Sequence, residues 1–279
     1  NLAGPFLFGV AVARTVGSEV AVPTSITIGV VMAALLSASV WNIATWYFGI
    51  PASSSHALVG GIVGAVAAGS GVAAIHADGL WKIAIALFLS PVVGFLAGML
   101  VTRITFRLAR GATPKANEFF KYAQLPTAIA LALSHGTNDA QKTMGIITLG
   151  LVVLGYQSEF VVPWWVVLVS ALAIGGGTAF GGWRIIHTLG GRFYRIRPIH
   201  SFTSQLSSAS VILTASLLGG PVSTTQVVSL AILGAGAAER KSMVRWDALT
   251  DIVLAWLLTV PAAAALAAAL YFVVRPIVE

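Results

Sequence analysis

The sequence predicts an all-α integral membrane protein with inverted-topology repeats, broken helices and paired short or re-entrant helices. The chain is 57% hydrophobic and 9% charged, whereas soluble domains carry about 25% charged residues. Strands of a membrane barrel would alternate in hydrophobicity over about ten residues, so the continuous apolar runs indicate helices. Runs long enough to span a bilayer, about 20 residues, occur at 25–48, 80–102, 126–154, 163–183 and 250–273, and shorter ones at 1–13, 53–69, 203–218 and 225–238.

The second observation is an internal duplication. Pro51 and Pro221 differ by 170 positions, and each is followed by three hydroxyl side chains, at 53–55 and at 223–225. The pairs Gly64 with Gly234 and Pro91 with Pro261 show the same offset of 170. Duplicated, interrupted apolar segments are typical of transporters whose substrate site lies between two repeats.

The charge distribution is the third observation. The net charge of +7 would suggest nucleic acid in a soluble protein, but here the basic residues lie in short segments between apolar runs. They therefore indicate topology, and we expect no nucleic-acid partner. Basic clusters predict a cytoplasmic location for 103–121, 184–197 and 240–245, whereas 69–80 and 155–162, which lack lysine and arginine, are expected outside.

The two repeats should therefore be inverted. The segment after the first hydroxyl cluster, 70–79, is expected outside, while its equivalent at 239–245 is expected inside. We expect residues 1–102 to form the first repeat, 103–125 a cytoplasmic basic linker and 126–279 the second repeat. The equivalent of the run 126–154 would precede residue 1, which predicts an N-terminally truncated chain without its first signature helix.

A polar cluster lies at 134–145, in the middle of the apolar run from Pro126 to Leu154. Polar groups at bilayer depth are costly, so they usually line a site or a cavity. We expect a helix break at 136–139 between helices 126–135 and 140–154, with Asn138 or Asp139 as N-cap. The alternative is a polar loop between two short helices, although each apolar half is too short to span a bilayer.

The duplicated hydroxyl clusters are each expected to begin a helix. Hydroxyls and free N–H groups at a helix start bind anions, helped by the helix dipole. Two such starts, supplied from opposite sides by inverted repeats, could converge on one multivalent anion. The alternative is that both clusters are ordinary N-caps and small packing residues.

These motifs resemble those of the inorganic phosphate transporter family, especially its bacterial low-affinity phosphate:cation symporters. The segment 134–145, Ser-His-Gly-Thr-Asn-Asp-Ala-Gln-Lys-Thr-Met-Gly, is similar to the family signature. The segment 41–57 resembles the first-repeat motif, and 220–226 resembles its second-repeat partner, with Gln226 where histidine is common. The tail from Trp246 to Pro261 also fits, so the resemblance covers essentially the whole chain.

The resemblance implies a multi-pass symporter in the cell (inner) membrane that moves inorganic phosphate inward with a cation. It implies no enzyme activity and no cofactor, and it suggests a homodimer in the lipid bilayer. Cation coupling is assigned to Asn138 and Asp139, because a cation bound at the carboxylate would relieve its repulsion of phosphate. Phosphate binding is assigned to Ser53, Ser54, Ser55, Thr137, Asn138, Ser223, Thr224 and Thr225.

Four further residues are auxiliary candidates. Lys142 could neutralise Asp139, attract phosphate or form a structural salt bridge. His56 and His135 could carry a proton or pack in hydrogen-bonded positions, and Gln226 occupies the position equivalent to His56. No metal is expected beyond Na⁺ at Asp139, and the residues do not decide whether Na⁺, H⁺ or a metal–phosphate complex is the coupled species.

Two other functions compete with phosphate symport. A carrier of another oxyanion, such as sulfate, could use the same scaffold. An intramembrane hydrolase is the remote alternative, because serine, histidine and aspartate all occur in apolar runs. The sequence contains neither a Gly-x-Ser-x-Gly elbow nor a His-Glu-x-x-His motif, and a single nucleophile would not require duplicated hydroxyl triplets.

Overall fold

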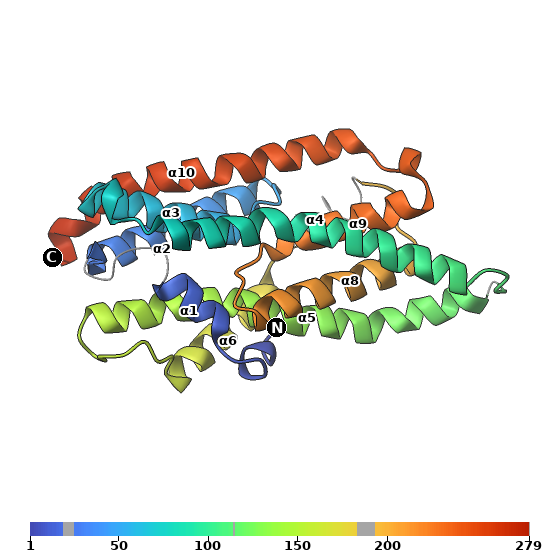
Figure 1. The fold of residues 1–279 in the computed structure, drawn as a ribbon, viewed down its shortest axis with the longest axis horizontal. Helices are drawn as coiled ribbons and strands as arrows, with labels where there is room; N and C mark the ends of the chain where they lie inside the picture. The colour runs from blue at the N-terminus through green and yellow to red at the C-terminus, as the bar shows by residue number, and fades with distance from the viewer. Residues whose placement is uncertain (19–24, 114, 183–192, 279) are drawn as a thin grey trace.

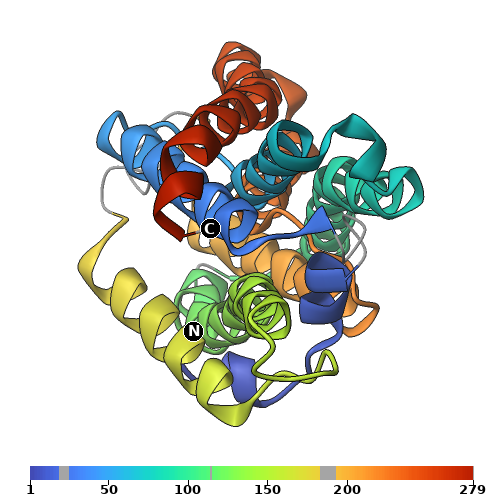
Figure 2. The ribbon, with the colours of Figure 1, turned by 90° about the vertical axis from the view of Figure 1, so that its left-hand side faces the viewer.

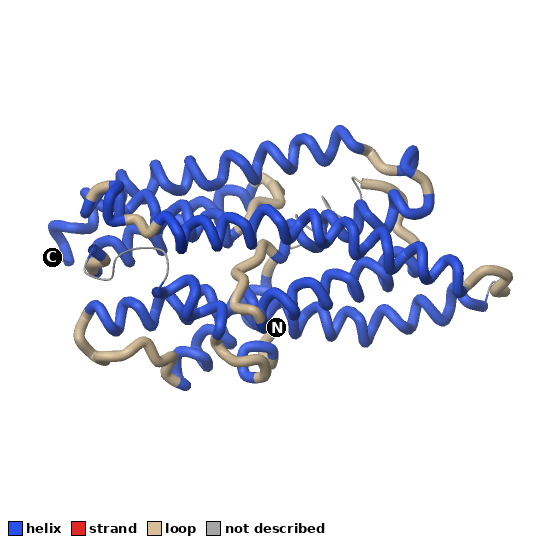
Figure 3. Tube along the Cα trace, viewed as in Figure 1, coloured by secondary structure: helices blue, strands red, loops and turns tan. Residues whose placement is uncertain are grey.

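The computed structural model describes residues 1–18, 25–113, 115–182 and 193–278. Within these residues the regular elements are helices, and none is a strand (Figure 3). The predicted all-α class is therefore confirmed. Viewed from one end, α5 (Lys115–Val153) and α6 (Trp164–Phe180) lie on one side of the molecule and α10 (Trp246–Val278) lies on the other (Figure 2).

Three helices are long and apolar enough to cross a membrane among the described residues. They are α2 (Ile28–Tyr47), α4 (Ala77–Leu108) and the part of α10 from Ile252 to Val278. Large apolar side chains on α4 and α10 are exposed rather than packed, including Leu96, Leu100, Leu254 and Phe272. Extended exposed apolar surface marks contact with another phase or partner, and together with the helix lengths it identifies a membrane protein.

The helix boundaries repeat with the same offset as the sequence motifs. α2 begins at Ile28 and its equivalent α8 (Pro198–Leu217) begins 170 positions later. In the same way α3 (Ser54–Ser70) corresponds to α9 (Thr224–Glu239), and α4 corresponds to α10 within one residue at its start. The short 3-10 helices Val72–Ala74 and Lys241–Met243 follow α3 and α9.

Helices from the first half of the chain pack against helices from the second half. α4 packs against α9, and its equivalent α10 packs against α3. Glycines permit this close approach: a Cβ at Gly64 would collide with the backbone of Ala264, and one at Gly234 with the backbone of Phe95. From the middle of the molecule α3 leads toward the end where the C-terminus lies, whereas α9 leads toward the opposite end (Figure 1).

Both hydroxyl clusters begin helices, as predicted. Ser53 and Ser223 are the N-caps of α3 and α9, and their hydroxyls accept from the backbone N–H groups of His56 and Gln226 at 3.2 and 3.4 Å. The preceding helices α2 and α8 end just before glycines with positive φ, 67° at Gly49 and 75° at Gly219. A left-handed glycine ends a helix without steric cost, so the chain can turn and start again within a few residues.

The expected break at 136–139 is wrong. α5 runs without interruption from Lys115 to Val153 and contains the whole polar cluster. Asn138 and Asp139 are not N-caps, because their side chains bind groups from other segments. Gly136 serves packing instead: a Cβ there would collide with the backbone of Asn1, in the segment that precedes the 3-10 helix Gly4–Phe6 and α1 (Ala11–Ser18).

The basic segment 103–125 is largely helical rather than an open linker. α4 continues to Leu108 and α5 begins at Lys115, so most of its basic side chains lie on helix ends. Of the cluster expected at 184–197, Arg184 and Arg192 lie outside the described residues.

Candidate functional site

The site forms where the starts of α3 and α9 meet the middle of α5. The connections 48–53 and 218–223 lie near the middle of the long axis rather than at an end of the molecule (Figure 1). The indole N–H of Trp256, on α10, donates to the carbonyl oxygen of Pro51 at 2.8 Å. This hydrogen bond fixes the approach to α3, because it holds the residue just before the hydroxyl cluster.

Asp139 lies at the centre of the site. Its Oδ1 accepts from the Lys142 ammonium at 2.6 Å. Its Oδ2 accepts from the Thr224 hydroxyl and lies close to the His135 imidazole Nε2, both at 3.0 Å. The carboxylate side chain is 16% exposed, so it faces protein groups and a pocket rather than lipid.

Lys142 is buried and joins three segments. Its Nζ donates to Asp139, to the Ser55 hydroxyl at 2.6 Å and to the Val222 carbonyl oxygen at 2.7 Å. The Ser55 hydroxyl in turn donates to the same Val222 carbonyl at 3.1 Å. One ammonium therefore links α5, the start of α3 and the residue before the α9 cluster. Of the roles left open for Lys142, the structure shows an ion pair with Asp139.

Asn138 binds the connection 218–223, which leads from α8 into α9, and holds it against α5. Its Nδ2 donates to the Ser216 hydroxyl at 2.8 Å and to the Gly220 carbonyl oxygen at 3.2 Å. Its Oδ1 is buried and has no hydrogen-bond partner among the residues that the structure describes. Buried polar atoms are nearly always paired, so this oxygen is an acceptor available to a bound ion or water.

A pocket of about 780 Å³ opens beside Asp139; we call it the polar pocket because polar side chains from several helices reach it, although apolar residues such as Ile174 and Phe180 also line it. Ser54 from α3 and Thr225 from α9 both line it, together with His135 from α5. Asn42 from α2 and Thr178 from α6 add polar groups from two more helices. Pockets of 300–1,000 Å³ with a few convergent polar groups are typical small-molecule sites, and the five helices here bring hydroxyl, amide, imidazole and carboxylate groups to one space.

The six hydroxyls of the two clusters divide into three pairs, and Thr137 stands apart from them. Ser54 and Thr225 line the pocket. Ser55 and Thr224 are committed to Lys142 and Asp139, and Ser53 and Ser223 are buried helix caps. The hydroxyl of Thr137 donates to the carbonyl oxygens of Gly4 and Leu133 at 2.9 and 2.8 Å, and Thr137 does not line the pocket.

The other auxiliary residues differ in position. His135 lies at the pocket, with Nδ1 2.7 Å from Asn1 Oδ1. His56 is buried with its Nδ1 2.7 Å from the Ser53 hydroxyl and its ring edge-on to Phe88, and it does not line the pocket. Gln226 is also buried at the base of α9.

The sequence reasoning missed several contributors, among them Asn42 and Thr178 in the pocket, Ser216 on Asn138, and Trp256 on Pro51. Asn42 and Trp256 lie inside motifs that carried the family resemblance, but nothing in their spacing indicated a site. Ser216 lies in an ordinary-looking helical segment rich in serine. Its role depends on a contact across 78 positions, which no local pattern shows.

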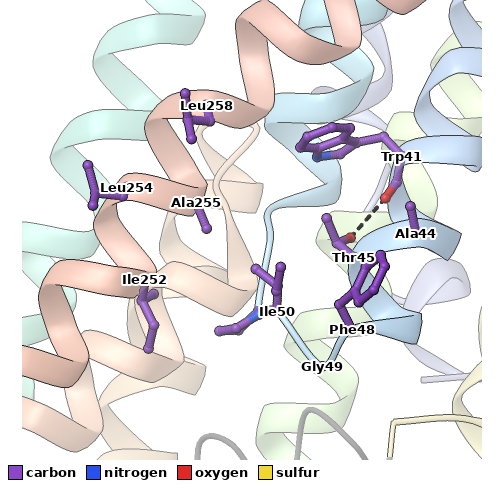
Figure 4. A pocket seen from close by; sticks show the side chains of 11 residues that line it. Trp41, Ala44, Thr45, Phe48, Gly49, Ile50, Ile252, Leu254, Ala255 and Leu258 are labelled. Carbon is purple, nitrogen blue, oxygen red and sulfur yellow. Dashed lines mark hydrogen bonds between the residues drawn. The ribbon is translucent and has the colours of Figure 1, made fainter.

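An apolar pocket of about 480 Å³ lies next to the polar one, between the end of α2 and α10 (Figure 4). Its lining residues are uncharged, and the Thr45 hydroxyl is occupied by the Trp41 carbonyl oxygen at 2.9 Å. An anion would lose its hydration there without gaining donors. This pocket therefore does not fit the predicted substrate, although Thr45 and Ile50 line both pockets.

The chain is similar to known transporters over nearly its whole length. Residues 1–267 match the model of the phosphate transporter family. A probable low-affinity inorganic phosphate transporter of Rhizobium meliloti (strain 1021) is 46% identical over 98% of this chain and 82% of the relative. Another of the same description, from Bacillus subtilis (strain 168), is 41% identical over 99% of this chain and 84% of the relative.

A solved structure shares the fold. It is described as "The sodium-dependent phosphate transporter", and it superposes with a TM-score of 0.88 over 99% of this chain and 88% of its own, at 24% sequence identity. The family match and the identities above 40% extend over both the signature at 134–145 and the two hydroxyl clusters. The chain is therefore a transporter rather than an enzyme, and it belongs to the phosphate transporter family.

Proposed function

We propose that this chain carries inorganic phosphate across the cell membrane in symport with a cation. The observation that carries the proposal is the polar pocket in which Ser54 and Thr225, from two repeat-related helix starts, meet Asp139. Hydroxyl donors and helix N-termini are suited to a multivalent anion. The relatives described as inorganic phosphate transporters support phosphate as that anion.

The cation acts at Asp139 together with Asn138. Lys142 pairs with Oδ1 of Asp139, but the carboxylate still carries negative charge at Oδ2 that would oppose a phosphate anion, and this repulsion is larger in a partly desolvated site than in water. A proton or Na⁺ bound on the Oδ2 side would remove that repulsion when phosphate enters. Oδ1 of Asn138, which has no partner in the described part of the chain, supplies a nearby acceptor for such an ion.

The carrier works as two inverted repeats, 1–102 and 126–279, in a multi-pass arrangement in the inner membrane. Support comes from the repeating helix boundaries, the exchanged packing of α4 with α9 and α10 with α3, and the opposite directions of α3 and α9. The family resemblance adds a homodimer as the assembled form. Inverted repeats allow the same site to open to either side of the membrane.

Radiolabelled phosphate uptake into proteoliposomes tests the proposal. We expect time-dependent uptake that requires an inward cation gradient, and imposing Na⁺ and H⁺ gradients separately identifies the ion. Competition with unlabelled sulfate and arsenate distinguishes a phosphate carrier from a sulfate carrier. For a phosphate carrier, arsenate, which has the shape and charge of phosphate, should compete, and sulfate should not. Uptake blocked by sulfate but not by phosphate would contradict the substrate assignment.

A further inference from the structure

The ammonium of Lys142 lies inside a set of oxygen atoms. Asp139 Oδ1, Ser55 Oγ and the Val222 carbonyl oxygen surround Nζ at 2.6, 2.6 and 2.7 Å. A carboxylate, a hydroxyl and a backbone carbonyl are the ligand types that proteins use for hard cations. We call these three oxygens the oxygen cage.

The oxygen cage is largely enclosed. Its ligand residues Ser55 and Val222 are 3% and 2% exposed and Lys142 is 4% exposed, whereas the Asp139 side chain is 16% exposed and lines the pocket. Water therefore competes little for the Ser55 and Val222 oxygens. A cation without compensating oxygen atoms would be very costly at such a position. The close contacts of Nζ with all three oxygens show that the cage compensates a positive charge.

We propose that Lys142 is a tethered cation that occupies an Na⁺-type site, and that removing its charge opens this site to free Na⁺. The role of this site in transport rests on the proposed function, whereas the site itself is defined by the contacts of Lys142 alone. The lysine fills the Oδ1 side of Asp139 and leaves only the Oδ2 side, where His135 and Thr224 lie, to a mobile cation. The unmodified chain accordingly needs no Na⁺ in the cage.

The cage also joins both hydroxyl clusters. Ser55 belongs to the start of α3, and Val222 directly precedes the cap of α9. A cation at this point holds the two repeat-related starts against α5 whether or not phosphate is bound. A tethered cation does so at every stage of transport, whereas a dissociable ion would do so only when bound.

The test replaces Lys142 with Met, which keeps a long unbranched side chain and removes the charge. The purified chain, in detergent and without phosphate, is heated in NaCl and in choline chloride of equal ionic strength, and binding of ²²Na⁺ is measured. We expect NaCl to raise the Tm of Lys142→Met relative to choline by more than it raises that of the unmodified chain. The variant should also bind one additional Na⁺ per chain.

Two matched variants locate the effect. Lys121→Met removes an exposed lysine from the same helix and should behave like the unmodified chain. Asp139→Asn combined with Lys142→Met removes the anionic ligand and should abolish the extra Na⁺ response. If Lys142→Met gains no extra Na⁺ response, or if the double variant keeps it, the proposal is overturned.

Lys142→Met leaves the Asp139 charge without its partner and could fail to fold in choline. Recovery of folded protein in NaCl alone would support the proposal. If neither salt gives folded protein, Lys142→Gln, whose amide can still donate to Asp139, is measured in the same way, and absence of an Na⁺ response in that variant overturns the proposal. Because no arm uses phosphate, failure of the unmodified chain to take up phosphate would refute the proposed function and leave the cage result standing.

Discussion

Lys142 and Asp139 form an ion pair of 2.6 Å between positions i and i+3 of α5, and each also binds a different repeat-related hydroxyl cluster. Lys142 reaches Ser55 in the first cluster, and Asp139 reaches Thr224 in the second. The pair thus connects both clusters through one turn of one helix. Changes to either residue should affect transport without requiring direct contact with phosphate.

Asp139→Asn should abolish concentrative uptake. The amide keeps the shape of the carboxylate but removes the charge that the driving cation compensates, so the dependence on Na⁺ or pH should be lost. Phosphate binding can persist, because Ser54 and Thr225 remain in the pocket. The measurement is uptake with and without a cation gradient in proteoliposomes, and normal gradient-driven accumulation by the variant would refute the coupling role.

Removing the pocket hydroxyls should weaken phosphate affinity. Ser54→Ala and Thr225→Val each delete one donor that lines the pocket, a loss of about 1–3 kcal/mol if the hydroxyl binds the anion. The KM for phosphate should therefore rise while the ion dependence persists. Ser210→Ala is the control, because the Ser210 hydroxyl is exposed and donates to the Leu206 carbonyl oxygen within its own helix. If Ser210→Ala raised the KM for phosphate by the same amount, the assignment of Ser54 and Thr225 to phosphate binding would be refuted.

Asn138→Ala should destabilise the packing of α5 against α8. The variant loses the donors to Ser216 and Gly220 and so removes the hydrogen bond that the Gly220 carbonyl oxygen accepts from Asn138. The expected decrease in unfolding free energy is about 1–3 kcal/mol. Thermal unfolding in detergent measures it, and an unchanged Tm would show that Asn138 is not a structural link.

Gly64→Ala and Gly234→Ala should destabilise the protein to similar extents. Each Cβ would meet the backbone of a partner helix, at Ala264 or at Phe95, and overpacking of this kind typically costs about 1–3 kcal/mol. Gly176→Ala is the matched control, since a Cβ there has no neighbour within 4 Å. Thermal unfolding of the three variants should separate the control from the other two.

Cysteine accessibility tests the inverted arrangement. The chain contains no cysteine, so single cysteines at Gly71 and at Ser242 report without background. The two positions follow α3 and α9, and we expect a membrane-impermeant thiol reagent to label them from opposite sides. Labelling of both from the same side would contradict the inversion.

Much of the fold follows from patterns within single segments. The two prolines followed by hydroxyl triplets located the starts of α3 and α9, because helix capping is determined by neighbouring residues. The offset of 170 between Pro51 and Pro221 likewise matched the helix boundaries of both halves.

The expected break in α5 failed for a reason that the segment alone does not contain. Gly136, Asn138 and Asp139 look like helix-breaking or capping residues when only their neighbours are considered. In the folded chain, Ser216 of α8 binds the Asn138 side chain and Thr224 of α9 binds the Asp139 side chain. The α5 backbone can then remain helical, and Gly136 only permits close packing of the N-terminal segment.

The same long-range contacts explain why the sequence could not assign a separate role to each hydroxyl of a cluster. Adjacent residues of one helix start point in different directions, so Ser54 lines the pocket while Ser55 binds Lys142. Sequence reasoning identified the clusters but treated their members alike. The division depends on where α5 lies, which only the tertiary structure defines.

The unbroken course of α5 limits how this carrier can move. His135, Asp139 and Lys142 lie on one continuous helix. Their mutual spacing should therefore stay constant when the pocket changes its opening. Lys142 of the same helix also binds Ser55 at the start of α3 and the carbonyl oxygen of Val222 just before α9. While these contacts last, a change in the opening of the pocket has to carry α5 and both helix starts together, so the displacement falls on the other helices that line the pocket, α2 and α6.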